Sequence, residues 1–119
     1  KGHACANCKL MEAKVWSDPA VQERLRKYVI IALYTDDRTQ LPDNEWITSA
    51  VDGRIKKTIG KINEDLEISL FRTNAIPLYA IVDHSGKLLN GTMATNYRIN
   101  EYIAWLDEGL SLFYQGSSK

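Results

Sequence analysis

The sequence predicts an α/β protein with one domain over residues 1–119, and three observations lead to this fold class. Short runs of apolar, β-rich residues have the composition of buried strands, and elsewhere apolar residues recur at helical spacing. The only two cysteines stand at the start of a helix-forming segment. A chain of 119 residues is long enough to bury one core without extra cross-links.

The first predicted elements are two consecutive helices. Cys5–Val15 contains helix-forming residues and neither Gly nor Pro, and the Trp-Ser-Asp-Pro stretch that follows interrupts it. We expect Ser17 to be the N-cap of a second, short helix that has Pro19 in its first turn. This helix would turn Val21 and Leu25 inward.

The central part of the chain predicts a strand, a loop and a helix. Tyr28–Tyr34 (YVIIALY) is continuously apolar, which is typical of a strand buried on both faces. Thr35–Val51 is polar and contains a proline, so we expect a long loop with a turn of helix. Ile62–Arg72 returns to helical spacing, with an apolar stripe along one side.

The C-terminal part predicts a β-hairpin and a long helix. Leu78–Asp83 and Lys87–Gly91 are expected to be the hairpin strands, joined by a His-Ser-Gly turn. We expect Gln115–Lys119 to fray. The apolar residues that indicate the helix recur at steps of three and four, namely Ile99, Tyr102, Ile103, Leu106, Leu110 and Phe113, and leave Glu101, Asp107 and Glu108 outward.

Composition excludes several classes of partner. Fifteen basic residues balance 15 acidic ones, so the chain has no global field that would attract nucleic acid or anionic lipid. The longest apolar runs are much too short to span a membrane. The opening Lys-Gly-His-Ala is not a signal peptide, and we expect the chain to be a piece of a longer protein.

The cysteine pair Cys5-Ala6-Asn7-Cys8 carries the strongest chemical signal. Two thiols at this spacing can close a small disulfide ring and reopen it. If Cys8 lies one turn inside a helix, Cys5 is left near the helix N-terminus, where unpaired N–H groups and the helix dipole stabilise a thiolate. Because the thiolate is the reactive form, this arrangement favours redox chemistry.

Two structural explanations of the pair stay open at this point. The pair is one half of a zinc site in some proteins, but structural zinc needs four ligands, and His3 and His84 do not form a second ligand pair. A static disulfide over so short a loop would constrain the unfolded chain little. Attachment of c-type haem requires histidine after the second cysteine, where this chain has Lys9.

The order of these elements resembles the thioredoxin fold, which implies a mixed central sheet flanked by helices. Three segments are similar to the C-terminal thioredoxin-like domain of the DsbD family of thiol:disulfide interchange proteins, in its Bacteroides-type versions. They are Cys5–Pro19 (CANCKLMEAKVWSDP), the strand end at residues 34–37 (YTDD) and Asn74–Asp83.

The resemblance implies a periplasmic domain carried on an inner-membrane protein that serves electron transport and cytochrome c biogenesis. Such a domain takes reducing equivalents from the membrane part. It passes them to a thioredoxin-like or immunoglobulin-like partner domain through a mixed disulfide, without a cofactor. In this chain Cys5 would be the attacking thiolate and Cys8 the resolving thiol, whose pKa should be higher because it is less exposed.

The resemblance also implies a cis proline opposite the cysteine pair, and Pro77 stands where it is expected. A cis bond before Pro77 would let Ile76 offer its N–H and C=O to an extended partner chain. Ala6 and Asn7, between the cysteines, are also expected to be substrate-binding residues. Residues at these two positions adjust the redox poise by altering hydrogen bonds to sulfur. The alternative for Pro77 is an ordinary trans proline that enters an edge strand.

Two further residues are candidates for the site. Glu12 lies four residues after Cys8, so its carboxylate would accept or return the proton of the resolving thiol. Its alternative is a solvated glutamate paired with a neighbouring lysine. Trp46, in the polar loop, is a candidate for partner docking, because tryptophan is enriched at interface hot spots. Trp16 is instead expected to anchor the core at the helix break.

One departure from the family pattern concerns the sheet. In the thioredoxin fold a buried parallel strand leads into the cysteine pair, whereas only Lys1–Ala4 precede Cys5 here. Without that strand the middle of the sheet would have unpaired edges. We therefore expect a fold that lacks this strand, with a domain-swapped homodimer as one way to fill the gap.

Two classes of function follow from these observations. One is a thiol–disulfide oxidoreductase that acts through Cys5 and Cys8. The other is a redox-inactive binding module of the same fold, which docks partners in a membrane assembly. Separate replacement of the two cysteines distinguishes these classes.

Overall fold

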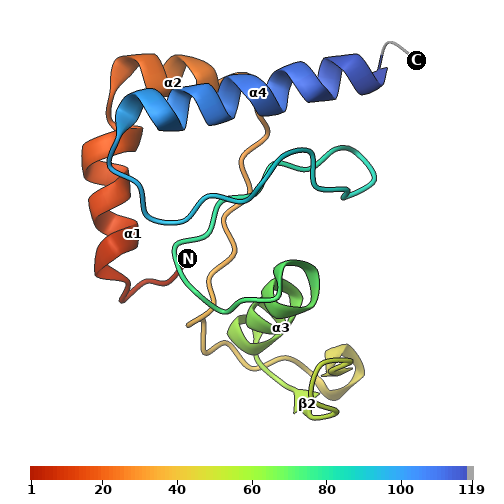
Figure 1. Cartoon of the computed structure of the whole chain (residues 1–119). Coiled ribbons are helices and arrows are strands. Elements are labelled where there is room, and N and C mark those ends of the chain that lie inside the picture. Colours follow the sequence, from red (N-terminus) through yellow and green to blue (C-terminus); the bar gives the residue numbers. More distant parts are fainter. Residues whose placement is uncertain (118–119) are drawn as a thin grey trace. The chain divides into compact units, whose positions relative to one another are not determined.

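The computed structural model describes residues 1–117, which form two compact units (Figure 1). Unit 1 contains residues 1–5 and 31–77, and unit 2 contains residues 6–30 and the chain from residue 78 onward. The elements in chain order are α1 (Ala6–Met11), the π-helical turn η1 (Glu12–Trp16), α2 (Pro19–Leu25), the 3₁₀ turn η2 (Asp43–Glu45), β1 (Ile47–Thr48), β2 (Ile55–Lys56), α3 (Ile59–Phe71) and α4 (Ile99–Ser117). No helix in the described part of the chain combines the length and hydropathy needed to cross a lipid bilayer.

In unit 2 the first helical run continues from α1 through η1, one residue beyond the predicted end. The second helix begins as predicted at Pro19, but Ser17 is not its N-cap. Asp18 takes this position, and its carboxylate accepts the N–H groups of Ala20 and Val21. The Ser17 hydroxyl instead donates to the Ala13 carbonyl one turn back, at 2.5 Å. Pro19 is favoured at the first helical position, which places the N-cap at the residue before it, and the charge of Asp18 complements the helix dipole there.

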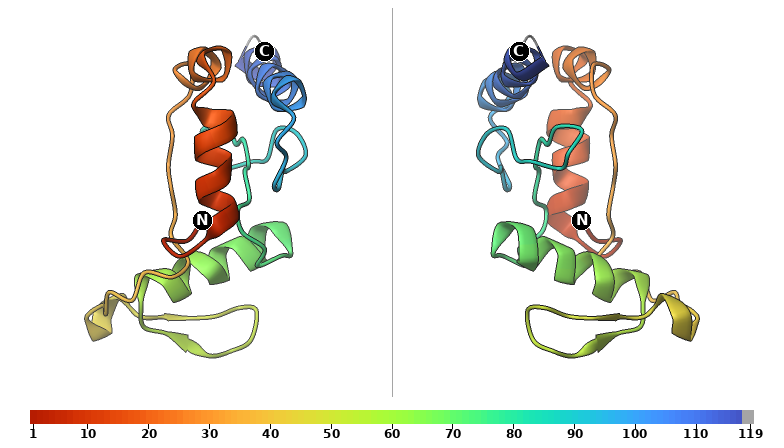
Figure 2. Two further views of the ribbon diagram at one scale, coloured as in Figure 1. Left: turned by 90° about the vertical axis from the view of Figure 1, so that its left-hand side faces the viewer. Right: turned by 90° about the vertical axis from the view of Figure 1, so that its right-hand side faces the viewer.

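Helices α2 and α4 lie side by side in both orientations (Figures 1 and 2), and they cover the core of unit 2. The prediction that Val21 turns inward is confirmed, as are the outward positions of the acidic residues of α4. We expected fraying from Gln115, but α4 continues to Ser117, so this prediction is wrong for residues 115–117. The final two residues lie outside the described part. The buried core consists of Met11, Val15, Val21, Ile81, Tyr102 and Leu106.

The predicted hairpin is present in unit 2 as two isolated antiparallel bridges. Tyr79 pairs with Met93, and Val82 pairs with Leu88. Two residues separate the bridged positions on the first strand and four separate them on the second, so the second strand contains a two-residue bulge. The turn is held by the Asp83 carboxylate, which accepts the N–H groups of Ser85 and Lys87.

The bulge of the hairpin is held by Trp105 of α4. The Asn90 side chain donates to the Trp105 carbonyl at 3.1 Å, and the Trp105 indole donates to the Gly91 carbonyl at 2.6 Å. Next to the bulge, Ile81 and Leu89 remain paired across the hairpin, because the Leu89 N–H donates to the Ile81 carbonyl. The helix side chain therefore satisfies one backbone carbonyl of the irregular strand, that of Gly91.

Unit 1 is organised by α3. Thr58 caps this helix by accepting the N–H of Lys61. Gly60 is buried, and its N–H donates to the Asp37 carbonyl at 2.9 Å. A Cβ at Gly60 would lie 2.6 Å from that carbonyl oxygen and 2.7 Å from the Thr35 oxygen. The sequence did not predict the small antiparallel pair β1–β2, which lies within and just after the expected polar loop. The expected helical turn in that loop is η2.

The predicted strand Tyr28–Tyr34 does not form, and this prediction is wrong. Val29 is 91% exposed and Ile31 is 76% exposed, so the segment is not buried on both faces. Within residues 1–117 the central sheet is reduced to the hairpin bridges, and the β1–β2 pair forms the one named sheet. A parallel strand needs a neighbouring strand that pairs with its N–H and C=O groups. In the described chain a single residue of such a neighbour pairs with this segment.

That residue is Lys1. Its amino group donates to the Leu33 carbonyl at 2.8 Å, and the Thr35 N–H donates to the Lys1 carbonyl, also at 2.8 Å. Bonds from both sides of one residue to positions two apart on its neighbour are the pattern of a parallel pair. The segment that leads to the cysteine pair therefore runs parallel to its neighbour, as the thioredoxin fold requires. The domain swap stays a prediction.

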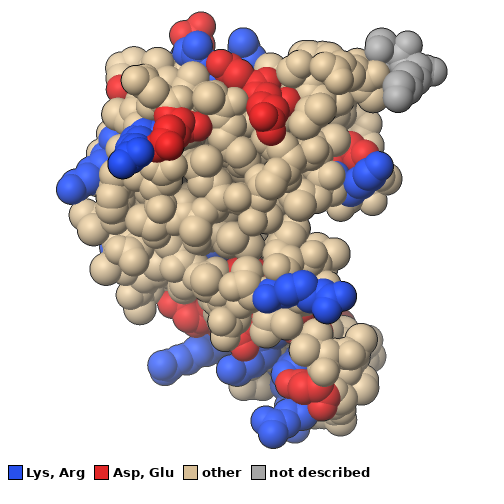
Figure 3. Space-filling view, in the orientation of Figure 1, with Lys and Arg blue, Asp and Glu red and all other residues tan. Residues whose placement is uncertain are grey.

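Charged side chains of both signs are interspersed on the face seen in Figure 3. This arrangement agrees with the equal numbers of basic and acidic residues.

Candidate functional site

The two cysteines form a disulfide at the start of the first helix. Cys5 immediately precedes α1 and is partly buried, whereas Cys8 lies inside the first turn of α1 and is 2% exposed. Cys8 is buried because it shares a side of the helix with Met11 and Val15, both in the core. The predicted order of exposure is confirmed.

A carboxylate holds the turn that leads into Cys5. The Cys5 N–H donates to the Gly2 carbonyl at 3.3 Å, which closes the turn. The two N–H groups inside it, of His3 and Ala4, donate to the two oxygens of Asp36 at 2.9 and 3.0 Å. These backbone donors, Ala4 first, hold the pKa of the Asp36 carboxyl below its usual range. Asp36 therefore fixes the backbone just before the exposed sulfur.

The Ile76–Pro77 peptide bond is cis, as predicted. Pro77 is buried, and the Ile76 side chain packs beside Gly2, because a Cβ at Gly2 would lie 3.0 Å from Ile76 Cδ1. Both residues belong to the unit that contains Cys5. The absence of a side chain at Gly2 thus allows the turn before Cys5 to approach the residue that precedes the cis proline. The proposed contact of Ile76 with a partner chain stays a prediction.

A family model for thioredoxin-like domains matches residues 2–109. The chain belongs to this family. A search of curated proteins found no match. The cis proline and the disulfide at the start of α1 are consistent with a CxxC redox motif in a thioredoxin-like domain.

In this thioredoxin-like domain Glu12 is the first residue of η1, and it lies close enough to Tyr79 to affect its ionisation. Burial first, and the negative charge of Glu12 second, raise the pKa of Tyr79 to about 12. The hydroxyl of Tyr79 therefore stays protonated at neutral pH. The role of Glu12 as a proton carrier for Cys8 stays a prediction.

The tryptophans of the thioredoxin-like domain have different surroundings. The Trp16 indole donates to the Tyr102 hydroxyl at 3.0 Å and packs against the core, which confirms its predicted structural role. The Trp46 indole donates to the Leu41 carbonyl at 2.8 Å, and the Lys57 ammonium lies 4.7 Å from the Trp46 ring centroid. Trp46 is partly exposed, and its role in docking stays a prediction.

Sequence reasoning did not assign a role to Asp36, Tyr97 or Glu67. Asp36 lies in the segment 34–37 that ends the apolar run and resembles the DsbD family, and this position was the available signal. The Tyr97 hydroxyl lies 3.5 Å from the Asn7 side-chain oxygen. Both carboxylate oxygens of Glu67 are buried without a hydrogen-bond partner in the described structure, and burial raises its pKa. Among residues 1–117 no group of three His, Cys, Asp or Glu side chains is placed to hold a metal ion.

Replacement of Asp36 by Ala is expected to release the turn before Cys5. The amides of His3 and Ala4 would lose their acceptor, so their NMR signals should shift upfield and exchange faster with solvent. Acid should do the same to the natural protein. Because the pKa of Asp36 is lowered in the folded state, its stabilising contribution is complete above the ordinary value of 3.8 and is lost as the pH falls through the lowered value.

Asp37→Ala is the matched control for this experiment. Asp37 also carries a carboxylate with a lowered pKa, but it accepts the N–H of Thr39 rather than the turn amides. If Asp36→Ala and Asp37→Ala leave the His3 and Ala4 amides equally protected, Asp36 does not hold the turn.

Proposed function

We propose that this domain is a thiol–disulfide oxidoreductase that works through Cys5 and Cys8. The observation that carries the proposal is the disulfide at the start of α1, which joins the partly exposed residue Cys5 to Cys8, a residue that is 2% exposed. An exposed sulfur is accessible to a partner, and a buried one is protected from it, so the two cysteines have distinct tasks.

The reaction begins with both cysteines reduced. The Cys5 thiolate attacks one sulfur of a partner disulfide, and the other partner sulfur leaves as a thiolate. The Cys8 thiol then loses its proton and attacks Cys5 Sγ, which breaks the mixed disulfide and releases the second partner thiolate. The domain gives two electrons to the partner and is left with the Cys5–Cys8 bond. Each released partner thiolate takes up a proton from solvent.

The finer part of the proposal concerns setting and partner. The similarity of Cys5–Pro19, residues 34–37 and Asn74–Asp83 to the DsbD family supports a periplasmic domain of an inner-membrane protein, which reduces a thioredoxin-like or immunoglobulin-like domain. The same similarity supports docking of an extended partner segment beside Ile76 and Pro77. No cofactor is needed, because both electrons reside in the two sulfurs.

Equilibration with glutathione tests the proposal. The protein is incubated over a series of glutathione ratios, quenched with acid, alkylated and weighed by mass spectrometry. We expect one transition between a doubly alkylated dithiol and an unmodified disulfide. Their ratio should change tenfold for each change of about 30 mV in the reduction potential of the glutathione mixture. A double Cys5→Ser, Cys8→Ser variant provides the blank. A disulfide that does not exchange at any ratio would contradict the proposal and favour a docking module.

A further inference from the structure

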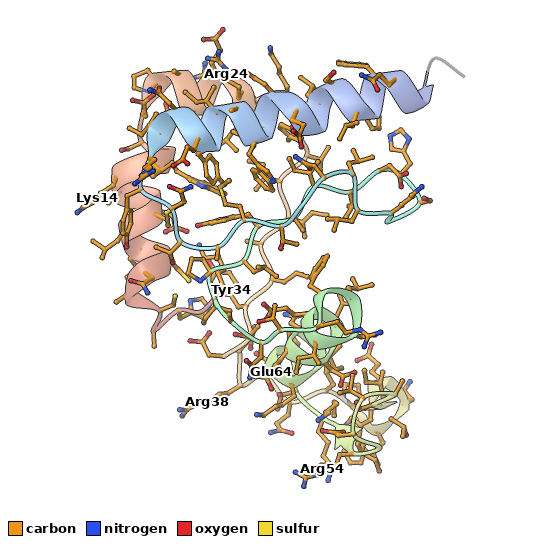
Figure 4. The ribbon with its side chains drawn as sticks, viewed as in Figure 1. Lys14, Arg24, Tyr34, Arg38, Arg54 and Glu64 are labelled. Atoms are coloured by element: carbon orange, nitrogen blue, oxygen red, sulfur yellow. The ribbon has the colours of Figure 1, made fainter. Side chains whose placement is uncertain are left out.

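The loop before α4 lies along one side of the helix that carries the cysteine pair. Three contacts join them: the Tyr97 hydroxyl donates to Asn7 Oδ1 at 3.5 Å, the Asn96 N–H donates to Met11 Sδ at 3.4 Å, and Lys14 Nζ lies 5.4 Å from the Tyr97 ring centroid. The contacted residues are spaced by four and then three positions, so they share one side of the helical run. Lys14 is labelled in Figure 4.

The position of Tyr97 is fixed on both sides along the chain. Before it, Asn96 accepts the N–H of Arg98 through its side-chain oxygen at 2.9 Å. After it, the Arg98 carbonyl accepts the N–H groups of Glu101 and Tyr102, which starts the hydrogen bonding of α4. Tyr102 is 1% exposed and belongs to the core. Tyr97 therefore directly precedes a long helix whose first turns are anchored in the core by Tyr102.

The ring of Tyr97 is 41% exposed, so burial does not explain its place. What distinguishes it is the residue that its hydroxyl contacts. Asn7 lies between the two cysteines, inside the ring closed by the disulfide, and its side chain is exposed. A group that restrains Asn7 restrains the backbone of that ring, whose conformation must change when the sulfurs separate.

We propose that Tyr97 is a positioning residue for thiol–disulfide exchange: it holds Asn7 in the conformation of the closed disulfide and so favours the oxidised form. The inference rests on the proposed function and deepens it. The Lys14 ammonium lies over the Tyr97 ring and keeps it against α1. The hydrogen bond to Asn7 is made by the Tyr97 hydroxyl, so removal of one oxygen atom tests it.

Tyr97→Phe is the direct test, by the glutathione equilibrium described above. The oxygen–oxygen distance of 3.5 Å exceeds the usual range for an O–H···O hydrogen bond, so the contact is weak. We therefore expect the equilibrium to shift toward the dithiol by about threefold, the low end for one neutral hydrogen bond. For a two-electron couple this corresponds to about 14 mV. Tyr114→Phe is the matched control, because Tyr114 is also an exposed tyrosine of unit 2 but is far along α4.

A double-mutant cycle with Asn7→Ala separates this role from a general effect on folding. If the hydroxyl acts through Asn7, Tyr97→Phe should have no further effect on the equilibrium once Asn7 is removed. Additive shifts, or a Tyr97→Phe variant that titrates like the natural protein, would overturn the inference while leaving the proposed function intact. A natural protein without any exchangeable bond would overturn both.

Discussion

Cys8→Ser is expected to arrest the reaction at a covalent complex, whereas Cys5→Ser is expected to abolish it. With Cys8 replaced, Cys5 can still attack a partner disulfide, but no second thiol releases the product. With Cys5 replaced, the remaining thiol is 2% exposed and cannot reach a partner sulfur. Disulfide reduction should fall to the uncatalysed background in both variants, and only Cys8→Ser should retain the partner.

The measurement is non-reducing electrophoresis and mass spectrometry after incubation with a disulfide-bonded thioredoxin-like domain. The complex of Cys8→Ser should disappear when dithiothreitol is added. The single variants are controls for each other, because each retains one thiol of the same pair. Equal trapping by Cys5→Ser and Cys8→Ser would show that exposure does not divide their tasks. Unchanged noncovalent binding by both, without trapping, would identify a docking module.

Gly60→Ala is expected to cost about 2–3 kcal/mol of unfolding free energy, in the upper part of the usual range for overpacking. The added Cβ would lie 2.6 Å from the Asp37 oxygen and 2.7 Å from both the Asp37 nitrogen and the Thr35 oxygen. All three are backbone atoms, so no side-chain rotation relieves the contact, and α3 must move away from this segment. The gain in helix propensity, about 1 kcal/mol, offsets only part of this cost.

Urea unfolding of the oxidised protein measures the effect, with Gly116→Ala as the matched control. Gly116 also lies in a helix, but nothing is within 4 Å of a Cβ built there. The control should be as stable as the natural protein or more stable by up to about 1 kcal/mol. If Gly60→Ala is as stable as Gly116→Ala, the close approach of α3 to Asp37 is not present in solution.

Elements with strong local signals were predictable from the sequence. The apolar residues of α4 recur at helical spacing, which predicts a helix whatever surface they pack against. The prediction is wrong only near the C-terminus, where fraying was expected from Gln115. The cysteine pair carries its meaning in adjacent residues, and the disulfide was predicted correctly. In both cases the relevant interactions lie within a few positions of one another along the chain. The cis bond at Ile76–Pro77 was predicted correctly from the resemblance to the thioredoxin fold.

Features that depend on distant residues were missed or predicted wrongly. The apolar run Tyr28–Tyr34 has the composition of a strand, but a strand forms only beside a partner, and the described chain pairs Lys1 alone with its end. Asp36 reaches back more than 30 positions to the turn before Cys5. Tyr97 and Asn7 are 90 positions apart. No local pattern marks these contacts.

The two-residue bulge that Trp105 contacts has one more consequence. Its insertion has an even number of residues, so Tyr79 and Ile81 still share the core-facing side with Leu89 and Met93. Removing one residue from Asn90-Gly91 would turn every later side chain of that strand to the opposite side, which would expose Met93 to solvent. Removing both would keep the alternation. Changes of length at this point therefore preserve the core-facing side of the strand only in steps of two.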